Sequence, residues 1–457
     1  MKADRFPNRR FRLVAALLLV WSVLAAPPTG CRSAPAVPNV VLVSIDCLGA
    51  AWLPPPVGEA WPVTLGALAK QGASFTHAYS PASWTLPAHA SLFTGLYPDR
   101  HGATDERRQL SPDVPTLAET LRSLGYRTVG FTDQGFLHPV FGMARGFDRY
   151  DQQDAPGPVV RVPRDGAPHP RTRHAIFDRA LAYLEAREVP RGPLFLFLHT
   201  YALHDSYLPR RASDRDLLPC LLGRTKCDDA QWGVLRDRYR IELARVDAAL
   251  GAVVQAVRRL RGPTMMIVLG DHGQGLDPHK GPVHHGGNLD PSLLHVPLLV
   301  VGPTVRPLAV ADPVSLVDVF PTILEIAGGK LPAGLDGHSF RGALSGRSLG
   351  PRVLLALEHS FSWTEGGIRL VPEARVEPRL KAVTDGKRWL VTGGAGGEVA
   401  YSLDPKEGAP RRIPPDQVPE ALRRWLTSRS ELAGKITAAP QLSDAVREQL
   451  RALGYVE

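Results

Sequence analysis

Acidic and imidazole side chains follow three separate apolar segments, each as long as a buried β-strand. They are Asp46 after residues 39–45 (NVVLVSI), His199 and His204 after residues 194–198 (LFLFL), and Asp271 with His272 after residues 264–269 (TMMIVL). Parallel strands that are buried on both faces are apolar throughout, and their carboxyl ends border one ligand-binding crevice. Because carboxylates and imidazoles bind hard or borderline divalent cations, we expect these residues to surround a metal ion.

A hydroxyl group that such a cation could activate lies in the segment SWTLPAHASLFTG at 83–95. Pro87 suits the first turn of a helix and Gly95 suits its end, so Thr85 is expected at the helix N-terminus. There the unpaired N–H groups and the helix dipole stabilise an alkoxide and an anionic substrate. A metal that touches the Thr85 oxygen would lower its pKa further.

A pair of histidines lies in the glycine-flanked loop HHGG at 284–287, ahead of the apolar segment 297–301. Histidine is suited to protonating a departing oxygen near neutral pH. His285 is the candidate, and the adjacent His284 could exchange roles with it.

The segments that must position these groups alternate between two patterns. Apolar segments at 127–132 and 297–301 add two strands, and helical patterns lie at 114–124, 174–187, 232–261 and 315–328. In the last of these, Ser315 and Asp318 are spaced as a capping pair. Alternating strands and helices predict an α/β sandwich with a mostly parallel sheet.

After about residue 345 the pattern changes to short antiparallel segments. The segments 379–392 and 398–403 flank GGAGG at 393–397, and helices are expected near 416–428 and 444–453. We therefore expect a catalytic domain over 38–345, a small antiparallel C-terminal subdomain over 350–435, and a tail with a helix over 436–457.

The composition is that of a globular protein, with 44% hydrophobic and 22% charged residues. The net charge of +9 suits an anionic substrate. Basic residues do not form a run with interleaved aromatic ones, so nucleic acid is not an expected partner.

The first 31 residues have the pattern of an export signal. A basic segment precedes the apolar run 13–26, which as a helix would span about 21 Å, short of the roughly 30 Å of a bilayer core. Pro28-Thr29-Gly30-Cys31 then resembles a lipoprotein cleavage site, although Pro28 replaces the usual aliphatic residue. We expect a periplasmic or cell-envelope protein lipidated at Cys31; plain secretion and an uncleaved anchor are the alternatives.

Four cysteines are too few for a disulfide framework. Cys220 and Cys227 could close a small loop or remain two thiols. Cys47 follows a strand and is expected to be a small core residue.

Through these motifs the chain resembles the sulfatase family of the alkaline-phosphatase-like superfamily. The similar segments, in family order, are NVVLVSIDCLGA, SWTLPAHASLFTGLYPDRHG, FLHTYALHDSYLP, VLGDHGQGL, HHGGNLDPSLLHVPLLV and VSLVDVFPTILEIAG. The resemblance covers about residues 38–345, with weaker matches beyond. It implies an alkaline-phosphatase-like α/β/α sandwich and a metal-dependent hydrolase of sulfate esters.

The resemblance also implies a role for each candidate residue. Asp46, Asp271 and His272 would bind one divalent cation, Ca²⁺ or Mg²⁺ by preference with Mn²⁺ and Zn²⁺ left open. Thr85 would be the nucleophile and a further metal ligand, attacking in line to form a covalent intermediate that water hydrolyses. His204 and His285 would bind the substrate oxygens, and one of them would protonate the leaving group. The substrate would be a small-molecule or glycan sulfate or phosphate ester.

Several positions depart from the family pattern. Cys47 replaces a second Asp, and Asp290-Pro291 replaces a common Tyr-Glu pair. His89 stands where the maturation signal has Arg, so with Thr85 no formylglycine is expected; His89 either supports the helix or binds substrate. Thr200 stands where a two-zinc phosphatase would need an Asp, which favours one metal over two.

Other interpretations stay open at this point. Thr85 favours phosphate or phosphonate esters as substrates, and phosphoryl transfer within the same superfamily is a further possibility. Cys47 favours a lapsed enzyme that binds anions without turnover. His199 is expected to be structural, and Lys280 and Arg100 are expected to be solvated rather than bound to the anion. Residues such as Asp46, Thr85 and His204 could instead cap turns, cap a helix or bind a loop carbonyl.

Overall fold

In the computed structural model, residues Val37–Glu457 form one compact unit. The structure describes residues 37–53, 62–105, 108–133, 135–153, 175–186, 192–204, 216–221, 225–276, 285–359, 361–364, 367–370, 378–393, 397–404, 410–428 and 440–452. The expected signal segment with Cys31, and also Lys280 and His284, lie outside the described residues. Within them, no helix is both long enough and apolar enough to cross a membrane.

One large sheet forms the centre of the fold. Its strand order is β4 (Arg149–Gln153), β3 (Arg127–Asp133), β5 (Leu194–Thr200), β1 (Asn39–Ile45), β6 (Thr264–Gly270), β7 (His295–Val301), β2 (Ala73–Tyr79) and β8 (Leu308–Val310), with β9 (Val314–Ser315) paired to β2. The pairs from β4 to β6 are parallel, whereas β7 is antiparallel to both β6 and β2. The predicted mostly parallel sheet is confirmed, and the reversal at β7 was not foreseen.

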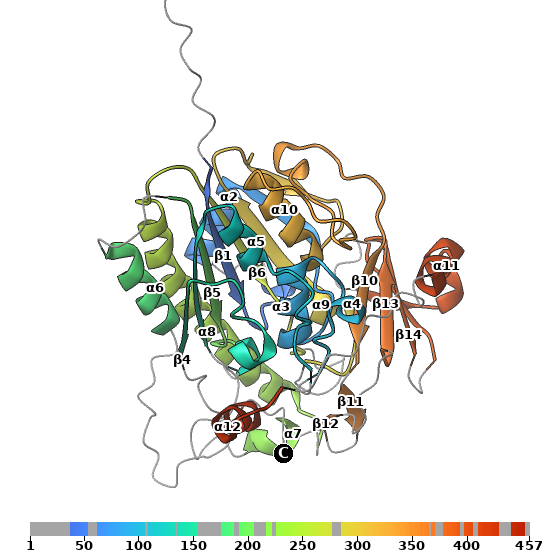
Figure 1. Ribbon diagram of the computed structural model, residues 1–457. Coiled ribbons are helices and arrows are strands. Elements are labelled where there is room, and N and C mark those ends of the chain that lie inside the picture. The colour runs from blue at the N-terminus through green and yellow to red at the C-terminus, as the bar shows by residue number, and fades with distance from the viewer. Residues whose placement is uncertain are drawn as a thin grey trace, which may run out of the picture. The chain divides into compact units, whose positions relative to one another are not determined.

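The central strands are apolar throughout because both of their faces are covered. On β1, Val40 and Leu42 pack into one hydrophobic cluster, and Val41, Val43 and Ile45 pack into the other. Helices α3 (Thr85–Thr94), α5 (Leu117–Ser123) and α10 (Val319–Ile326) cover the first face, and α6 (Ala175–Glu185) and α8 (Asp229–Val257) cover the second (Figure 1). The alternation of β1 side chains follows from the two-residue period of a strand.

Five helices fall close to predicted ranges, whereas those at 63–71, 98–101, 218–221 and 291–294 were not predicted. In chain order, these helices are α2 (Val63–Gln71), α3 (Thr85–Thr94), α4 (Pro98–His101), α5 (Leu117–Ser123), α6 (Ala175–Glu185), α7 (Leu218–Leu221), α8 (Asp229–Val257), α9 (Pro291–Leu294) and α10 (Val319–Ile326). The predicted capping pair is present, since Asp318 accepts from the Ser315 backbone N–H at 2.9 Å. It caps a 3₁₀ turn, Leu316–Asp318, which leads into α10.

A separate antiparallel sheet follows the large one. Its order is β10 (Leu354–Glu358), β13 (Leu380–Thr384), β14 (Arg388–Gly393), β15 (Val399–Ser402) and β16 (Arg411–Ile413), and β11 (Phe361–Thr364) pairs with β12 (Gly367–Leu370) apart from it. Helix α11 (Glu420–Ser428) packs on this sheet through Leu422 and Leu426, and α12 (Asp444–Ala452) packs on the core of the large sheet. The predicted small antiparallel sheet is confirmed, while the expected domain boundaries stay a prediction.

Two cysteine predictions are decided by the structure. Cys220 and Cys227 form a disulfide, which closes the small loop. Cys47 is fully buried beside core residues, as expected, but its sulfur also contacts His285. The side chain therefore lies at the edge of the candidate site and not only in the core.

The ends of β1 and β6 meet at a point where only glycine fits. A Cβ atom on Gly270 would lie 2.0 Å from the carbonyl oxygen of Leu48, in the turn after Asp46. Gly270→Ala should therefore lower the free energy of unfolding by about 3 kcal/mol, because the two turns must separate. Chemical denaturation measures this change.

The matched control is Gly233→Ala, the same substitution inside α8, where a Cβ atom meets nothing within 4 Å. Alanine in a helix interior should raise the free energy of unfolding by up to about 1 kcal/mol. Equal effects of the two substitutions would show that β1 and β6 do not constrain each other at Gly270.

Candidate functional site

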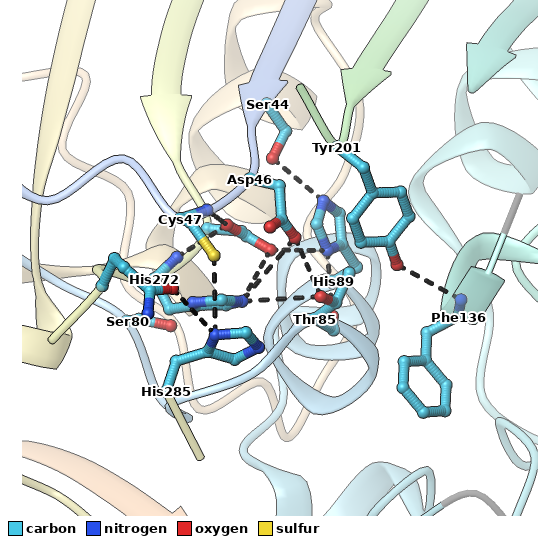
Figure 2. A network of polar contacts seen from close by, with 12 residues as sticks. Ser44, Asp46, Cys47, Ser80, Thr85, His89, Phe136, Tyr201, His272 and His285 are labelled. Carbon is cyan, nitrogen blue, oxygen red and sulfur yellow. Dashed lines mark hydrogen bonds and ion pairs between the residues drawn. The ribbon is translucent and has the colours of Figure 1, made fainter. Parts of the chain in front are cut away.

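Asp46 and Thr85 meet at the carboxyl end of the large sheet. Asp46 follows β1, and its backbone N–H donates to the Thr200 carbonyl at 3.1 Å. Thr85 is the first residue of α3, and its hydroxyl donates to Asp46 Oδ1 at 2.9 Å (Figure 2). Pro87 lies in the first turn and Gly95 ends the helix with φ 68°, as predicted. Both site residues are fully buried.

Asp271 follows β6 and reaches the same point from the next strand. Its Oδ1 accepts from the backbone N–H groups of Cys47 at 3.2 Å and His272 at 2.8 Å. Its Oδ2 lies 3.4 Å from His272 Nε2. The two backbone donors fix the carboxylate, so that Oδ2 lies between the His272 ring and His89 Nδ1, the latter at 3.6 Å.

One ring nitrogen of His272 carries the proton, and the other is left as an acceptor. Nδ1 lies 3.0 Å from the Gly273 carbonyl, which can only accept, so Nδ1 donates. The Nε2 lone pair then faces Thr85 Oγ1 at 3.5 Å and Asp46 Oδ1 at 3.7 Å. A backbone carbonyl that orients an imidazole in this way is usual for metal-binding histidines.

These groups fit a divalent cation. Asp46 Oδ2 and Asp271 Oδ2 are buried and have no hydrogen-bond partner among the described residues. Two unpaired carboxylate oxygens that face an imidazole lone pair repel one another unless a cation lies between them. Asp46, Asp271 and His272 have donor atoms within 4.8 Å of one another and would hold the ion, with Thr85 beside it. We call these three residues the carboxylate triad.

The carboxylates differ in acidity because their surroundings differ. Burial, and next the charge of Asp46, raise the pKa of Asp271 well above its ordinary value. Burial also raises the pKa of Asp46, but the imidazoles of His199 and His272 outweigh it, so that this pKa falls well below its ordinary value. Two ionised carboxylates therefore repel each other in the metal-free protein, whereas a bound cation favours the ionised form of both.

His285 and His204 are both buried and lie together beside the carboxylate triad. Their ring centroids are 4.8 Å apart, and the His285 ring stacks on His272 at 4.7 Å. His285 Nδ1 donates to Gln274 Oε1 at 3.0 Å. This contact orients the His285 ring.

His89 lies one turn along α3 from Thr85, and both of its ring nitrogens are engaged. Nδ1 donates to the Thr85 carbonyl at 2.9 Å, and Nε2 lies 2.9 Å from Ser44 Oγ. Burial, and next the charge of His199, lower the pKa of His89 well below its ordinary value. These contacts favour the supporting role for His89 over a substrate contact.

Other histidines and basic residues are placed as follows. His199 is fully buried, with Nε2 3.9 Å from Asp46 Oδ1, so it lines the site. Arg100 binds Asp336 at 3.0 Å and the Gly334 carbonyl. Thr200 ends β5 and has no carboxylate that could bind a second metal ion. Asp290 caps α9 by accepting a hydrogen bond from the Ser292 backbone N–H.

Three site residues were not found from the sequence. Gln274 orients His285, and Ser44 contacts His89. Glu358 ends β10 and accepts from Ser83 Oγ at 3.0 Å and Gly287 N at 3.1 Å. It thus connects the small sheet to the segments that carry Thr85 and His285. Nothing local in the sequence around Glu358 indicated this, because β10 itself was not predicted.

A family model and several known proteins are similar to this chain. The model of the Sulfatase family matches residues 38–329. The chain is 28% identical over 289 residues to an ulvan-active sulfatase of Formosa agariphila, covering 62% of this chain and 52% of that protein. It is 25% identical over 398 residues to arylsulfatase K of Canis lupus familiaris, covering 71% and 72%. The chain thus spans about half the length of the first of these relatives.

A solved structure shares the fold. The phosphonate monoester hydrolase SpPMH of Silicibacter pomeroyi superposes with a TM-score of 0.65 at 20% identity, over 86% of this chain and 94% of that one. At this identity the likeness concerns the fold alone.

Proposed function

The chain belongs to the sulfatase family and is a hydrolase acting on ester bonds, and from this premise we propose that it cleaves sulfate esters of small molecules or glycans. In this proposal Thr85 is the nucleophile and one divalent cation is bound by the carboxylate triad. The observation that carries it is the position of Thr85 Oγ1, 2.9 Å from Asp46 Oδ1 and 3.5 Å from His272 Nε2.

The surroundings of Thr85 prepare its oxygen for attack. The hydroxyl proton points at Asp46, and the oxygen lies at the N-terminus of α3, where the helix dipole favours negative charge. When bound, the cation supplies positive charge that stabilises the alkoxide and the substrate anion. Burial excludes water, so these interactions act in a low dielectric.

The reaction then needs a base and an acid. Thr85 Oγ1 passes its proton to Asp46 Oδ1, the acceptor of its hydrogen bond, as it attacks the sulfur in line; the bond to the leaving alcohol breaks and a sulfate ester of Thr85 forms. His285 Nε2 donates the proton that the leaving oxygen takes, and His204 orients the sulfuryl oxygens beside it. In the second step water attacks the sulfur, His285 accepts the water proton, the bond between sulfur and Thr85 Oγ1 breaks, and Asp46 returns the proton to Thr85 Oγ1.

Thr85 favours a second candidate, cleavage of phosphate or phosphonate esters, or phosphoryl transfer to an alcohol. A threonine ester cannot regenerate an aldehyde by eliminating sulfate, so each turnover depends on attack by water or by an acceptor alcohol. The residues at the site accommodate a tetrahedral sulfur or phosphorus centre alike.

A substrate panel tests these proposals directly. Purified protein is stripped of metal, reloaded with Mg²⁺, Ca²⁺, Mn²⁺ or Zn²⁺, and assayed on nitrophenyl sulfate, phosphate, phosphodiester and phosphonate. We expect metal-dependent turnover with the sulfate ester as the best substrate. Faster cleavage of a phosphorus ester would replace the first candidate by the second. Anion binding without turnover on any ester would indicate a lapsed enzyme.

We further propose that the chain is exported to the periplasm or cell envelope and lipidated at Cys31. The basic start, the apolar run 13–26 and the Thr29-Gly30-Cys31 sequence support this. Mass spectrometry of protein made in a bacterial host tests it. A mature chain that begins at an acylated Cys31 is expected, and a chain that retains residue 1 would contradict the proposal.

A further inference from the structure

A second group of metal-binding side chains adjoins the carboxylate triad. Donor atoms of Cys47, His272 and His285 all lie within 4.8 Å of one another, and all three residues are buried. Cys47 Sγ is 3.6 Å from His285 Nδ1. We call these three residues the thiol–imidazole triad; the proposed reaction uses only its two histidines.

The backbone directs the Cys47 side chain to this position. Cys47 has φ 60° and is the one non-glycine residue in the left-handed region among the described residues. Its N–H donates to Asp271 Oδ1 at 3.2 Å, and its carbonyl accepts from the Tyr239 hydroxyl at 2.9 Å. Because both backbone groups are held, the sulfur remains beside His272 and His285.

The two triads prefer different ions. Two carboxylates with one imidazole suit Mg²⁺, Ca²⁺ or Mn²⁺, whereas one thiolate with two imidazoles suits Zn²⁺ or Cd²⁺. The carboxylate triad independently indicates a cation here, through the buried unpaired oxygens Asp46 Oδ2 and Asp271 Oδ2.

Both triads depend on the same lone pair. His272 Nδ1 donates to the Gly273 carbonyl, so only Nε2 can bind a metal. One nitrogen lone pair binds one ion at a time. The thiol–imidazole triad and the complete carboxylate triad therefore cannot each bind a metal ion at the same time.

We propose that the thiol–imidazole triad is an inhibitory site for thiophilic cations, Zn²⁺ above all. On binding, a sulfur–metal bond forms and the thiol proton passes to solvent. His285 Nδ1 gives up its hydrogen bond to Gln274 and binds the metal. The ring proton then lies on Nε2 instead of Nδ1. His285 can then no longer cycle between neutral and protonated forms, and His272 is withdrawn from the catalytic cation. The inhibition rests on the proposed function, whereas the binding does not.

Cadmium titration of the full-length protein tests the binding without an activity assay. Metal-stripped protein should develop a near-ultraviolet sulfur-to-cadmium absorption that saturates at one equivalent. The band should be absent in Cys47→Ser and in Cys47→Ala, which replace the thiol in two ways while keeping the backbone contacts. His285→Gln should weaken Cd²⁺ binding about tenfold or more, because one of three ligands is lost.

Competition with magnesium tests the shared lone pair. Excess Mg²⁺ should move the Cd²⁺ titration to higher concentration in the unaltered protein. In the Mg²⁺-loaded enzyme, Zn²⁺ should inhibit ester cleavage, and Cys47→Ser should raise the half-inhibitory Zn²⁺ concentration about tenfold or more. Melting curves of the two Cys47 variants establish that they are folded.

The outcomes separate this inference from the proposed function. A Cys47-dependent cadmium band in a protein that cleaves no ester would leave the metal site standing and remove the function. A band that persists in the folded Cys47 variants, or is insensitive to both His285→Gln and Mg²⁺, would overturn the inference. Absence of any band would do the same.

Discussion

Thr85→Ala is expected to lower kcat by at least about 10⁴-fold, because it removes the attacking oxygen itself. Thr85→Ser keeps the hydroxyl at the same helix N-terminus and should retain measurable turnover. Steady-state kinetics measures both variants. Intact-mass spectrometry of quenched reactions should in addition show a covalent adduct on the unaltered protein and on Thr85→Ser, and none on Thr85→Ala.

The matched control is Thr94→Ala, the same substitution at the other end of α3. Thr94 is buried, and its hydroxyl donates to the Ala90 carbonyl at 2.7 Å, away from Asp46. It should change stability but leave kcat within a few-fold. Full activity in Thr85→Ala would assign the nucleophile elsewhere, and equal losses in both variants would indicate damage to the helix rather than to the chemistry.

The sequence predicted the central strands because each is buried on both faces. A continuous apolar run as short as 194–198 fits a buried strand better than a helix, and the polar residues that end these runs therefore marked the site. Strand β2 (Ala73–Tyr79) was missed, because its alternation of buried and exposed residues is broken between Phe75 and Ala78, where the register with β7 shifts. The antiparallel direction of β7 was missed since an apolar run carries no sign of its direction.

A site residue could be predicted from the sequence where it directly follows a predicted strand or starts a predicted helix. Asp46, Asp271 and His272 are of this kind, and so is Thr85 at a helix start marked by Pro87. The contacts of Glu358 with Ser83 and Gly287 join segments that lie far apart in the chain. The left-handed conformation of Cys47 depends on Asp271 and Tyr239 in the same way. Pairings of this type appear only once the chain is folded.

Asp271→Asn should change the stability of the metal-free and the metal-loaded protein in opposite directions. Asp271 and Asp46 are buried together, and burial with the Asp46 charge raises the pKa of Asp271 well above its ordinary value. Asparagine keeps the Oδ1 acceptor for the Cys47 and His272 N–H groups and removes the buried charge. The metal-free variant should therefore melt at a higher temperature than the metal-free unaltered protein.

With a divalent cation the order should reverse. A ligand at 100 times its Kd stabilises the folded state by about 2.7 kcal/mol, and loss of one anionic ligand should raise the Kd by more than about 100-fold. The unaltered protein should then gain melting temperature on addition of metal, while Asp271→Asn gains little. Calorimetric titration measures the Kd and differential scanning calorimetry measures the melting temperatures.

A buried carboxylate outside the site provides the control for this reversal. Asp247 accepts from the backbone N–H groups of Thr64 at 2.9 Å and Leu65 at 2.8 Å. Asp247→Asn removes the negative charge from two hydrogen bonds that need it, so the variant should melt lower with and without metal by similar amounts. If Asp271→Asn behaved like Asp247→Asn, the two carboxylates at the end of β1 and β6 would be structural, and the cation that organises the proposed chemistry would have no place there.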